Sequence, residues 1–215
     1  IIDGAVDRDT LTEMSDGQGS FSEESYTRVI DATGRASHAL ITHEHLDHVM
    51  AFVRHPYPEA IAPKLRLTQP QLDGLPEHAR DGQLPAPIAA VEPIDLSAPT
   101  RIAPGIVAVA APGHSQGTAL IYVRTTGREY LFIGDIAWVM DSIEQLRGRP
   151  RLISVFLPGV DPDRPAVLRQ LRALHDLAAA EPTLVIVPAH DDDYLRGLVA
   201  DGALIEEFRG APAAE

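Results

Sequence analysis

Short apolar runs separated by turn residues fill the second half of the chain. Three of them are rich in Val, Ile and Ala and are bounded by Pro-Gly or Gly-Arg pairs, which predicts strands over 105–110, 118–124 and 129–134. Further along, leucines recur at helical spacing after Asp163-Arg164-Pro165 until Pro182, an apolar run at 184–187 predicts another strand, and a last helix should begin at Asp192 or Asp193. Strands followed by alternating helices and strands predict a layered α/β domain.

The first half of the chain carries weaker patterns, in which turn residues and prolines matter more than periodicity. They predict the end of a strand at Ile1-Ile2, a loop over 15–20, and a helix that is capped by Ser22, continues through Ile30 and ends at Gly34. A short buried strand is predicted over 39–42. In the proline-dense region from 54 to 99, only a short helix beginning near Thr68 is expected. This proline-rich region either walls a substrate pocket or forms a surface excursion.

Composition and charge narrow the class of protein. A chain of 215 residues with 45% hydrophobic residues is long enough for a buried core, so we expect one domain over 1–215. A formal charge of −13 and a pI near 5.0 argue against nucleic acid as a partner, because phosphates are bound by clustered Lys and Arg. The absence of Cys excludes disulfides and thiolate-bound zinc, so any metal must be bound by imidazole and carboxylate.

The sequence says less about location and assembly. No apolar run approaches the roughly 18 residues of a membrane span, and no signal peptide is visible. The chain begins with Ile1 rather than Met, so we expect a segment upstream of it. Localisation therefore stays open, with a soluble cytoplasmic protein slightly favoured, and the oligomeric state is not predicted.

The largest cluster of possible metal ligands is the segment His43-Glu44-His45-Leu46-Asp47-His48, which places three imidazoles and a carboxylate in one short turn. The turn follows the predicted strand 39–42, and loop side chains at the C-terminal end of a strand can converge on one point. His43 and His45 project to the same side of an extended segment, and Asp47 and His48 follow as the backbone turns into a helix. The pattern indicates two sets of metal ligands and hence two metals.

Three later apolar runs each end in a single ligand-type residue beside a turn. These residues are His114 after Pro112-Gly113, Asp135 after Gly134, and His190 after Pro188-Ala189. Taken singly, the histidines could be ordinary loop residues and Asp135 could cap a helix. Taken together, they predict metal ligands at one edge of a sheet, where strand ends collect.

These motifs, in this order, resemble the metallo-β-lactamase superfamily of metal-dependent hydrolases. The resemblance implies a four-layer αββα sandwich, with an N-terminal hairpin that we expect to be incomplete here, and a dinuclear site that usually holds two Zn²⁺, with Mn²⁺ or Fe²⁺ as alternatives. It implies that the first metal is bound by His43, His45 and His114, that the second is bound by Asp47, His48 and His190, and that Asp135 bridges both.

The resemblance further implies a hydrolase in which the metal pair activates a hydroxide. Water held between two ions ~3.5–4 Å apart ionises near neutral pH, and Asp47 beside it can pass a proton to the leaving group. We expect a small-molecule substrate with an ester, lactone or related acyl bond. A phosphodiesterase with the same metal pair, a mononuclear-iron sulfur dioxygenase and an inactive metal-binding scaffold are the alternatives.

Two positions narrow the branch of the superfamily. Class B β-lactamases typically carry Cys or Ser where this chain has Asp135, so β-lactamase activity is not expected. Acyl-homoserine-lactone lactonases fit the size of the chain, but they usually place a Tyr three residues beyond the bridging Asp, where this chain has Trp138. We expect Trp138 to line the pocket or to be buried rather than to act in catalysis.

Other polar residues have two interpretations each. His55 either lines the pocket or lies in a surface loop, with the surface loop favoured. Asp191 either orients His190 from behind or caps the last helix. Arg147, Arg149 and Arg151 either contact an anionic group or form a solvated turn, with the turn favoured.

Overall fold

The computed structural model describes residues 1–157 and 159–208 and has a mixed α/β fold. It divides into two compact units, one formed by Ile1–Ile94 with Glu207 and Phe208, and the other by Asp95–Glu206. The mixed α/β class is the one that the alternation of strands and helices predicted. No helix of the described part of the chain is long and apolar enough to cross a membrane.

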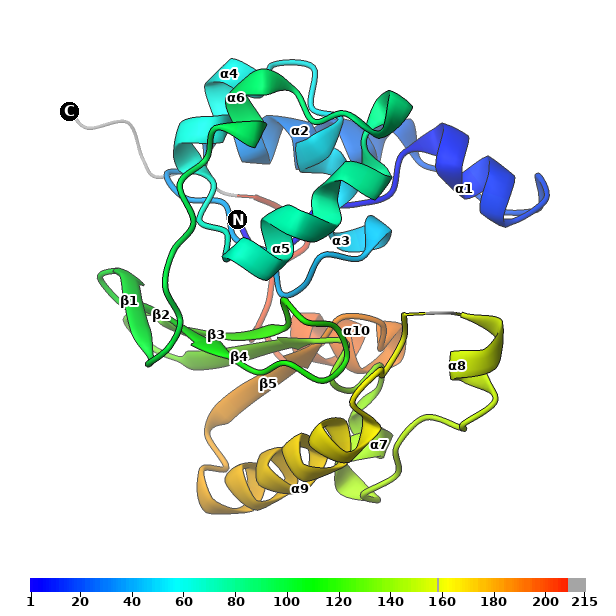
Figure 1. Cartoon of the computed structure of the whole chain (residues 1–215). Helices are drawn as coiled ribbons and strands as arrows, with labels where there is room; N and C mark the ends of the chain where they lie inside the picture. The colour runs from blue at the N-terminus through cyan, green and yellow to red at the C-terminus, as the bar shows by residue number, and fades with distance from the viewer. Residues whose placement is uncertain (158, 209–215) are drawn as a thin grey trace. The chain divides into compact units, whose positions relative to one another are not determined.

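The second unit is built on one five-stranded sheet with the strand order β1-β2-β3-β4-β5 (Figure 1). The strands are β1 (Thr100–Ala103), β2 (Ile106–Ala110), β3 (Ala119–Arg124), β4 (Glu129–Gly134) and β5 (Leu184–Pro188). Neighbouring strands are antiparallel from β1 to β4, and β5 is parallel to β4. The four strands predicted from the apolar runs are confirmed, and the edge strand β1 was missed because its sequence Thr-Arg-Ile-Ala has little apolar character.

Strand direction decides where the predicted ligands of this unit lie. Because β2 and β4 are both antiparallel to β3, they run in the same direction, and β5 runs with them. Their C-terminal ends therefore reach the same edge of the sheet. Gly134 pairs with Pro188, so the residues that follow β4 and β5 start side by side.

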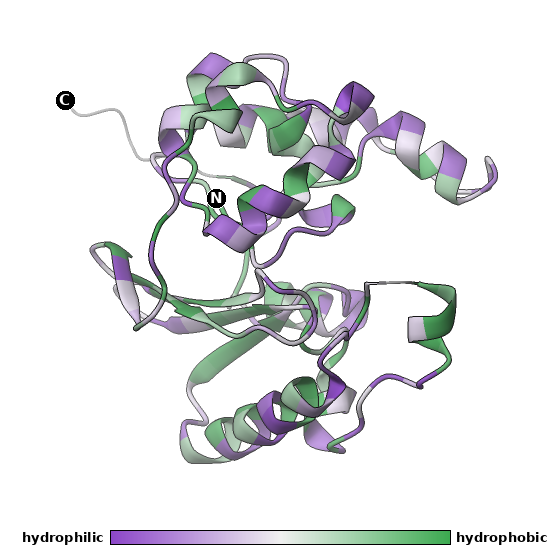
Figure 2. Cartoon of the chain, viewed as in Figure 1, coloured by the Kyte–Doolittle hydropathy of each residue, from purple (hydrophilic) through white to green (hydrophobic). Residues whose placement is uncertain are grey.

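The second unit also contains short and long helices, of which α7 (Met140–Glu144) and α9 (Arg164–Ala180) pack on the sheet. The others are α8 (Ile153–Phe156) and α10 (Asp192–Ala200). Asp163 caps α9 by accepting the N–H of Ala166 at 3.0 Å, as its sequence predicted. In Figure 2, hydrophobic and hydrophilic residues alternate along α9. Its apolar residues pack with α7 on the sheet in a buried cluster of Leu131, Ile133, Ile136, Ile143, Val167, Leu171, Leu174 and Ile186.

The first unit is mainly helical. It contains α1 (Arg8–Met14), α2 (Glu23–Arg35), α3 (Leu46–Val53), α4 (Pro58–Ile61), α5 (Gln69–Gly74) and α6 (Ala86–Ala89), with short 3-10 turns at Ala62–Lys64, Leu75–His78 and Arg80–Gly82. Ser22, the predicted cap of α2, and Thr68, near which a short helix was predicted, each accept the N–H of the residue three positions further on. The proline-dense region contains only short elements, as expected, whereas α2 continues one residue past Gly34. Helix α1 was missed because it buries no residue and has no apolar periodicity.

The two strands predicted near the start of the chain are shorter than expected. Within the described residues they appear as isolated parallel bridges that pair Ile2 with Leu40 and Ala39 with Leu65. The ladder stops where the carboxylate of Asp3, rather than a backbone carbonyl, accepts the N–H of Thr42. This exchange places a carboxylate directly beside the histidine cluster.

Candidate metal centre

His43 and His45 form the first part of the histidine cluster, on the turn that leads into α3. Nε2 of His43 lies 2.9 Å from Nδ1 of His45, and the two rings meet edge to face with centroids 4.6 Å apart. On the far side of the His43 ring, Nδ1 lies 3.2 Å from the hydroxyl of Thr42. One nitrogen of each ring therefore points at a common position, and a hydroxyl fixes the other nitrogen of His43.

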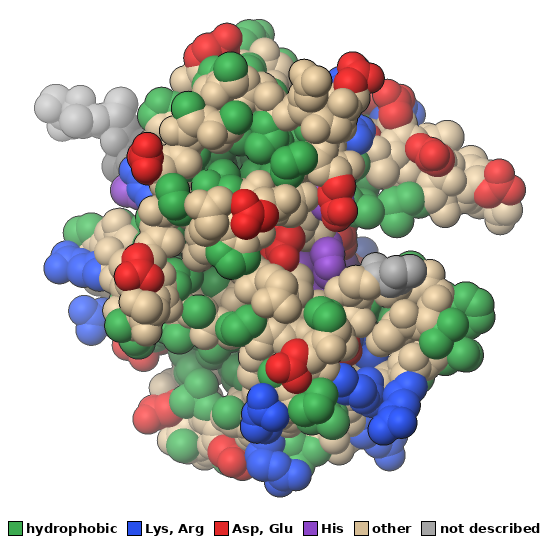
Figure 3. Space-filling model, viewed as in Figure 1, with side chains coloured by type: hydrophobic (Ala, Val, Ile, Leu, Met, Phe, Trp, Pro, Cys, Tyr) green, Lys and Arg blue, Asp and Glu red, His purple; other side chains and the backbone are tan. Residues whose placement is uncertain are grey.

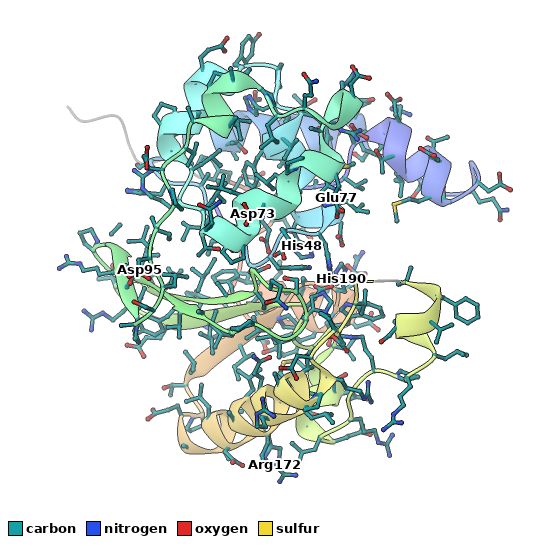
Figure 4. The ribbon with its side chains drawn as sticks, in the orientation of Figure 1. His48, Asp73, Glu77, Asp95, Arg172 and His190 are labelled. Atoms are coloured by element: carbon teal, nitrogen blue, oxygen red, sulfur yellow. The ribbon has the colours of Figure 1, made fainter. Side chains whose placement is uncertain are left out.

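Asp47 and His48 form a second pair on the first turn of α3, which begins at Leu46 (His48 is labelled in Figure 4). Nε2 of His48 lies 3.5 Å from a carboxylate oxygen of Asp47. Its Nδ1 lies 3.0 Å from Oδ2 of Asp3. Asp3 also accepts the N–H of Thr42 at 2.6 Å and its hydroxyl at 2.8 Å. Asp3 was not predicted to belong to the site, although it ends an apolar run as the predicted ligands do.

In the second unit, His114, Asp135 and His190 come together at the sheet edge where β2, β4 and β5 end. Nε2 of His114 lies 3.6 Å from Oδ2 of Asp135, and Nε2 of His190 lies 3.1 Å from Oδ1 of the same carboxylate. Each oxygen of Asp135 thus faces a different imidazole. This is the geometry expected of a carboxylate that bridges two metal ions, and the register of β4 and β5 produces it.

The Nδ1 side of His114 contacts a buried carboxylate, that of Asp161, which was not predicted from the sequence. Nδ1 of His114 lies 2.9 Å from Oδ1 of Asp161, and Asp161 is also paired with Arg149. Burial raises the pKa of Asp161, but the hydrogen bonds from His114 and Arg149 lower it more, so its pKa lies below the ordinary value and the group is ionised at neutral pH. The expectation that Arg149 belongs to a solvated turn is wrong, because its guanidinium is buried against this carboxylate.

Trp138 and Asp191 also contact the ends of β4 and β5. The indole N–H of Trp138 donates to Oδ2 of Asp135 at 2.6 Å, and the indole lies edge-on to the ring of His190 with centroids 6.1 Å apart. The carboxylate of Asp191 accepts the N–H of Met140 at 2.8 Å and that of Tyr194 at 3.1 Å. Asp191 therefore caps α10, one of the two roles that the sequence allowed.

His55 does not lie in a surface loop, and that expectation is wrong. The residue is 6% exposed at the end of α3, where its Nδ1 accepts the N–H of Tyr57 at 3.1 Å. Burial lowers the pKa of His55 below its ordinary value, so the ring is neutral at pH 7. The ring of Tyr57 lies edge-on to that of His55, with the ring centroids 6.2 Å apart.

The donors of each unit fit a divalent metal ion. Two ligands that bind one ion at about 2.0–2.2 Å in a tetrahedral arrangement are separated by about 3.4 Å. The separations within the units run from 2.9 Å for His43 and His45 to 3.6 Å for His114 and Asp135, on both sides of this value. All of the donors are imidazole nitrogens or carboxylate oxygens, a set suited to zinc, manganese or iron.

Solved structures with a similar fold include proteins that hold a metal centre. The structure of an N-acyl homoserine lactone hydrolase with the product N-hexanoyl-L-homoserine bound at its catalytic metal centre is 16% identical, with a TM-score of 0.60 over 91% of this chain and 78% of that one. The dizinc quorum-quenching lactonase AidC is 13% identical, with a TM-score of 0.52 over 89% and 68%. A protein solved in a di-iron-bound form, TTHA1623, is 24% identical, with a TM-score of 0.50 over 88% and 80%.

These likenesses establish the fold, which is that of the metallo-β-lactamases, as the sequence motifs predicted. No curated protein sequence matches the chain. The family model described as the beta-lactamase superfamily domain matches residues 17–190, a span that contains every predicted ligand. The chain therefore belongs to the beta-lactamase superfamily.

Proposed function

We propose that this protein is a metal-dependent hydrolase that acts on an ester, lactone or related acyl bond. The observation that carries the proposal is the carboxylate of Asp135, whose two oxygens face His114 and His190 separately, 3.6 and 3.1 Å away. A carboxylate that only capped a helix would have no reason to hold one imidazole at each oxygen. Membership of the superfamily supports the same role for Asp135.

The proposed centre uses all seven predicted ligands. We propose that His43, His45 and His114 would hold one metal, that Asp47, His48 and His190 would hold the other, and that both would share Asp135. The ligand-atom separations within each unit support this assignment, as does the absence of Cys from the chain. We propose two Zn²⁺ as the resident metals, with Mn²⁺ or Fe²⁺ as alternatives, since related folds are known in dizinc and di-iron forms.

A metal pair in this centre supplies a water molecule of lowered pKa and polarises the carbonyl under attack. The protein supplies orientation and proton transfer. Thr42 and Asp3 each bind the Nδ1 side of an imidazole, which would orient the Nε2 atoms of His43 and His48 for metal binding. The side chain of Asp47 is 37% exposed, so its carboxylate can take a proton from the attacking water and deliver it to the leaving group.

Trp138 takes the place of the Tyr that acyl-homoserine-lactone lactonases usually carry three residues beyond the bridging Asp. Its only polar group, the indole N–H, is bonded to Asp135 at 2.6 Å, so it does not offer the donor that a Tyr at this position gives lactonases. The acyl class is supported by the lactone hydrolase fold, whereas homoserine lactone itself is one member of the class among several.

Metal analysis combined with a substrate panel tests the proposal. Purified protein loaded with zinc, manganese or iron is assayed on homoserine lactones, p-nitrophenyl esters, thioesters and bis-p-nitrophenyl phosphate. We expect two metals per chain and turnover of at least one acyl substrate. Turnover of the phosphodiester alone would overturn the acyl assignment, and a chain that binds no metal would overturn the centre.

Variants of the ligands sharpen this test. His114→Ala and Asp135→Asn are expected to reduce metal content below two per chain and turnover by at least about a hundredfold, because each removes a ligand at the edge of the sheet. His175→Ala is the matched control, since the side chain of His175 on α9 is 40% exposed. Ligand variants with the metal content and turnover of the control would refute the assignment.

A further inference from the structure

Arg149 is a buried arginine to which the proposed chemistry gives no role. It is 8% exposed, whereas other arginines of the second unit gather on the surface around α9, among them Arg172 (Figures 3 and 4). Burying a guanidinium is unfavourable unless a carboxylate pairs with it and its N–H groups are hydrogen-bonded. The contacts that compensate for its burial lead to two of the proposed metal ligands.

The first contact is with Asp161. Nε of Arg149 donates to Oδ2 at 3.0 Å and Nη2 donates to Oδ1, so the planar guanidinium holds the carboxylate by two parallel bonds. Oδ1 also lies 2.9 Å from Nδ1 of His114, and Nη2 lies 3.0 Å from the same nitrogen. The ionised carboxylate can only accept, and Nη2 already donates to Oδ1, so in this arrangement Nδ1 carries the proton and donates it to Asp161. The approach of Nη2 to Nδ1 is then a contact between two donors and not a hydrogen bond, and Nε2 keeps the lone pair that a metal ion needs.

The second contact is with Trp138. Cζ of Arg149 lies 4.9 Å from the centroid of the indole, within the range of a cation stacked on an aromatic face. The indole N–H in turn donates to Oδ2 of Asp135. Because Trp138 has no other polar atom, the position of its ring sets the direction from which Asp135 is held.

We propose that Arg149 is a positioning residue for two metal ligands at once. Through Asp161 it fixes the tautomer of His114, and through Trp138 it fixes the orientation of Asp135. This inference rests on the proposed metal centre. A lysine cannot take the place of Arg149, because an ammonium group has neither paired donors for the carboxylate nor a flat face for the indole.

The variant Arg149→Lys tests the proposal, since it keeps the charge and removes the geometry. Metal affinity is measured by competition with a chromophoric chelator and is expected to fall about 10- to 100-fold. Arg196→Lys is the matched control, because Arg196 forms an exposed pair with Asp192 on α10 at 2.8 Å, and its metal affinity should equal that of the wild type. A folded Arg149→Lys protein with metal affinity within twofold of the control overturns the proposal.

Two measurements on metal-free protein separate this inference from the proposed function. Trp138 is the only Trp of the chain, so fluorescence emission reports on this indole alone, and ¹⁵N NMR reports the tautomer of His114. In Arg149→Lys we expect a shifted emission and a mixture of tautomers. If both are unchanged, Arg149 has no positioning role, whereas a wild-type chain that binds no metal refutes the metal centre itself.

Variants that break only one of the two contacts of Arg149 keep the proposal testable if Arg149→Lys fails to fold, as judged by far-UV circular dichroism. Asp161→Asn removes the charge behind His114 and is expected to mix its tautomers and to lower metal affinity about tenfold. Trp138→Phe keeps a ring for stacking but removes the donor to Asp135, and a decrease of similar size is expected. If both folded variants bind metal as tightly as Arg196→Lys, the proposal is wrong.

Discussion

Substitutions of Asp3 can distinguish its effect on the orientation of His48 from its effect on the stability of the fold. The carboxylate accepts two hydrogen bonds from Thr42, at 2.6 and 2.8 Å, and lies 3.0 Å from Nδ1 of His48. The backbone of Asp3 has a φ of 56°, in the left-handed region that Asn and Gly adopt more easily than Ala. Replacement by Asn, Gly or Ala therefore removes different parts of its role.

The expected losses follow from these contacts. Asp3→Asn keeps the shape and the backbone conformation but turns one acceptor oxygen into a donor, which should lower the free energy of unfolding by about 1–2 kcal/mol. Asp3→Gly leaves the buried N–H of Thr42 without its acceptor, for a loss of about 2–4 kcal/mol. Asp3→Ala loses the same bonds and adds about 1 kcal/mol of left-handed backbone strain.

Urea unfolding of the metal-free variants, followed by far-UV circular dichroism, measures these losses, and chelator competition measures metal affinity. We expect the stability order Asn, Gly, Ala and, for Asp3→Asn, metal binding about 10- to 100-fold weaker than in the wild type. Asp16→Asn is the control, because Asp16 has a φ of 49° but is exposed. Asp3→Asn with wild-type metal affinity would refute the orienting role, and equal stability of the Gly and Ala variants would refute the backbone argument.

Three further predictions concern folding. Leu171→Ala, at a core residue that is 2% exposed, should lower the free energy of unfolding in urea by about 2–5 kcal/mol, whereas Leu168→Ala, at a residue that is 42% exposed, should lower it by clearly less. Gly105→Ala should destabilise by at least about 1 kcal/mol, because φ is 79° and a Cβ would lie 2.6 Å from the carbonyl oxygen of Arg124; wild-type stability in urea would contradict this. Burial raises the pKa of Asp7, but its hydrogen bonds with Thr10 and Arg54 lower it more, so the pKa lies below the ordinary value. The carboxylate therefore stabilises the fold above its unfolded pKa, and this contribution is lost as the pH falls through the folded pKa. The stability difference between wild type and Asp7→Asn should therefore be largest near pH 7 and shrink below about pH 4; a difference independent of pH would contradict the assignment.

The strands and long helices were predictable because each carries a local signal. Apolar runs bounded by turn residues located β2 to β5, and the pair Asp163 and Pro165 located the start of α9. The ligand motifs were equally local, since each ends an apolar run. The edge strand β1 and helix α1 have neither signal, because they bury little side-chain surface.

The residues behind the ligands were not predictable in the same way. Asp161 follows Val160, but it lies two positions before Asp163, whose capping role accounts for the local pattern. Arg149 belongs to a run of alternating arginines that is typical of a solvated turn. Its pairing with Asp161 spans 12 positions, and only the folded chain brings the two together.

The positions of the imidazole nitrogens distinguish a metal centre from a histidine-rich turn that forms only local hydrogen bonds. In three rings the Nδ1 atom meets an oxygen of the protein: the hydroxyl of Thr42 for His43, the carboxylate of Asp3 for His48, and the carboxylate of Asp161 for His114. In the same three rings Nε2 is directed at another predicted ligand, 2.9, 3.5 and 3.6 Å away. A loop that only satisfied its own polar groups would not repeat this division between the two nitrogens in both units. Fixing one nitrogen and presenting the other is how proteins orient imidazole toward a metal ion, so the division supports the ligand assignment without reference to any relative.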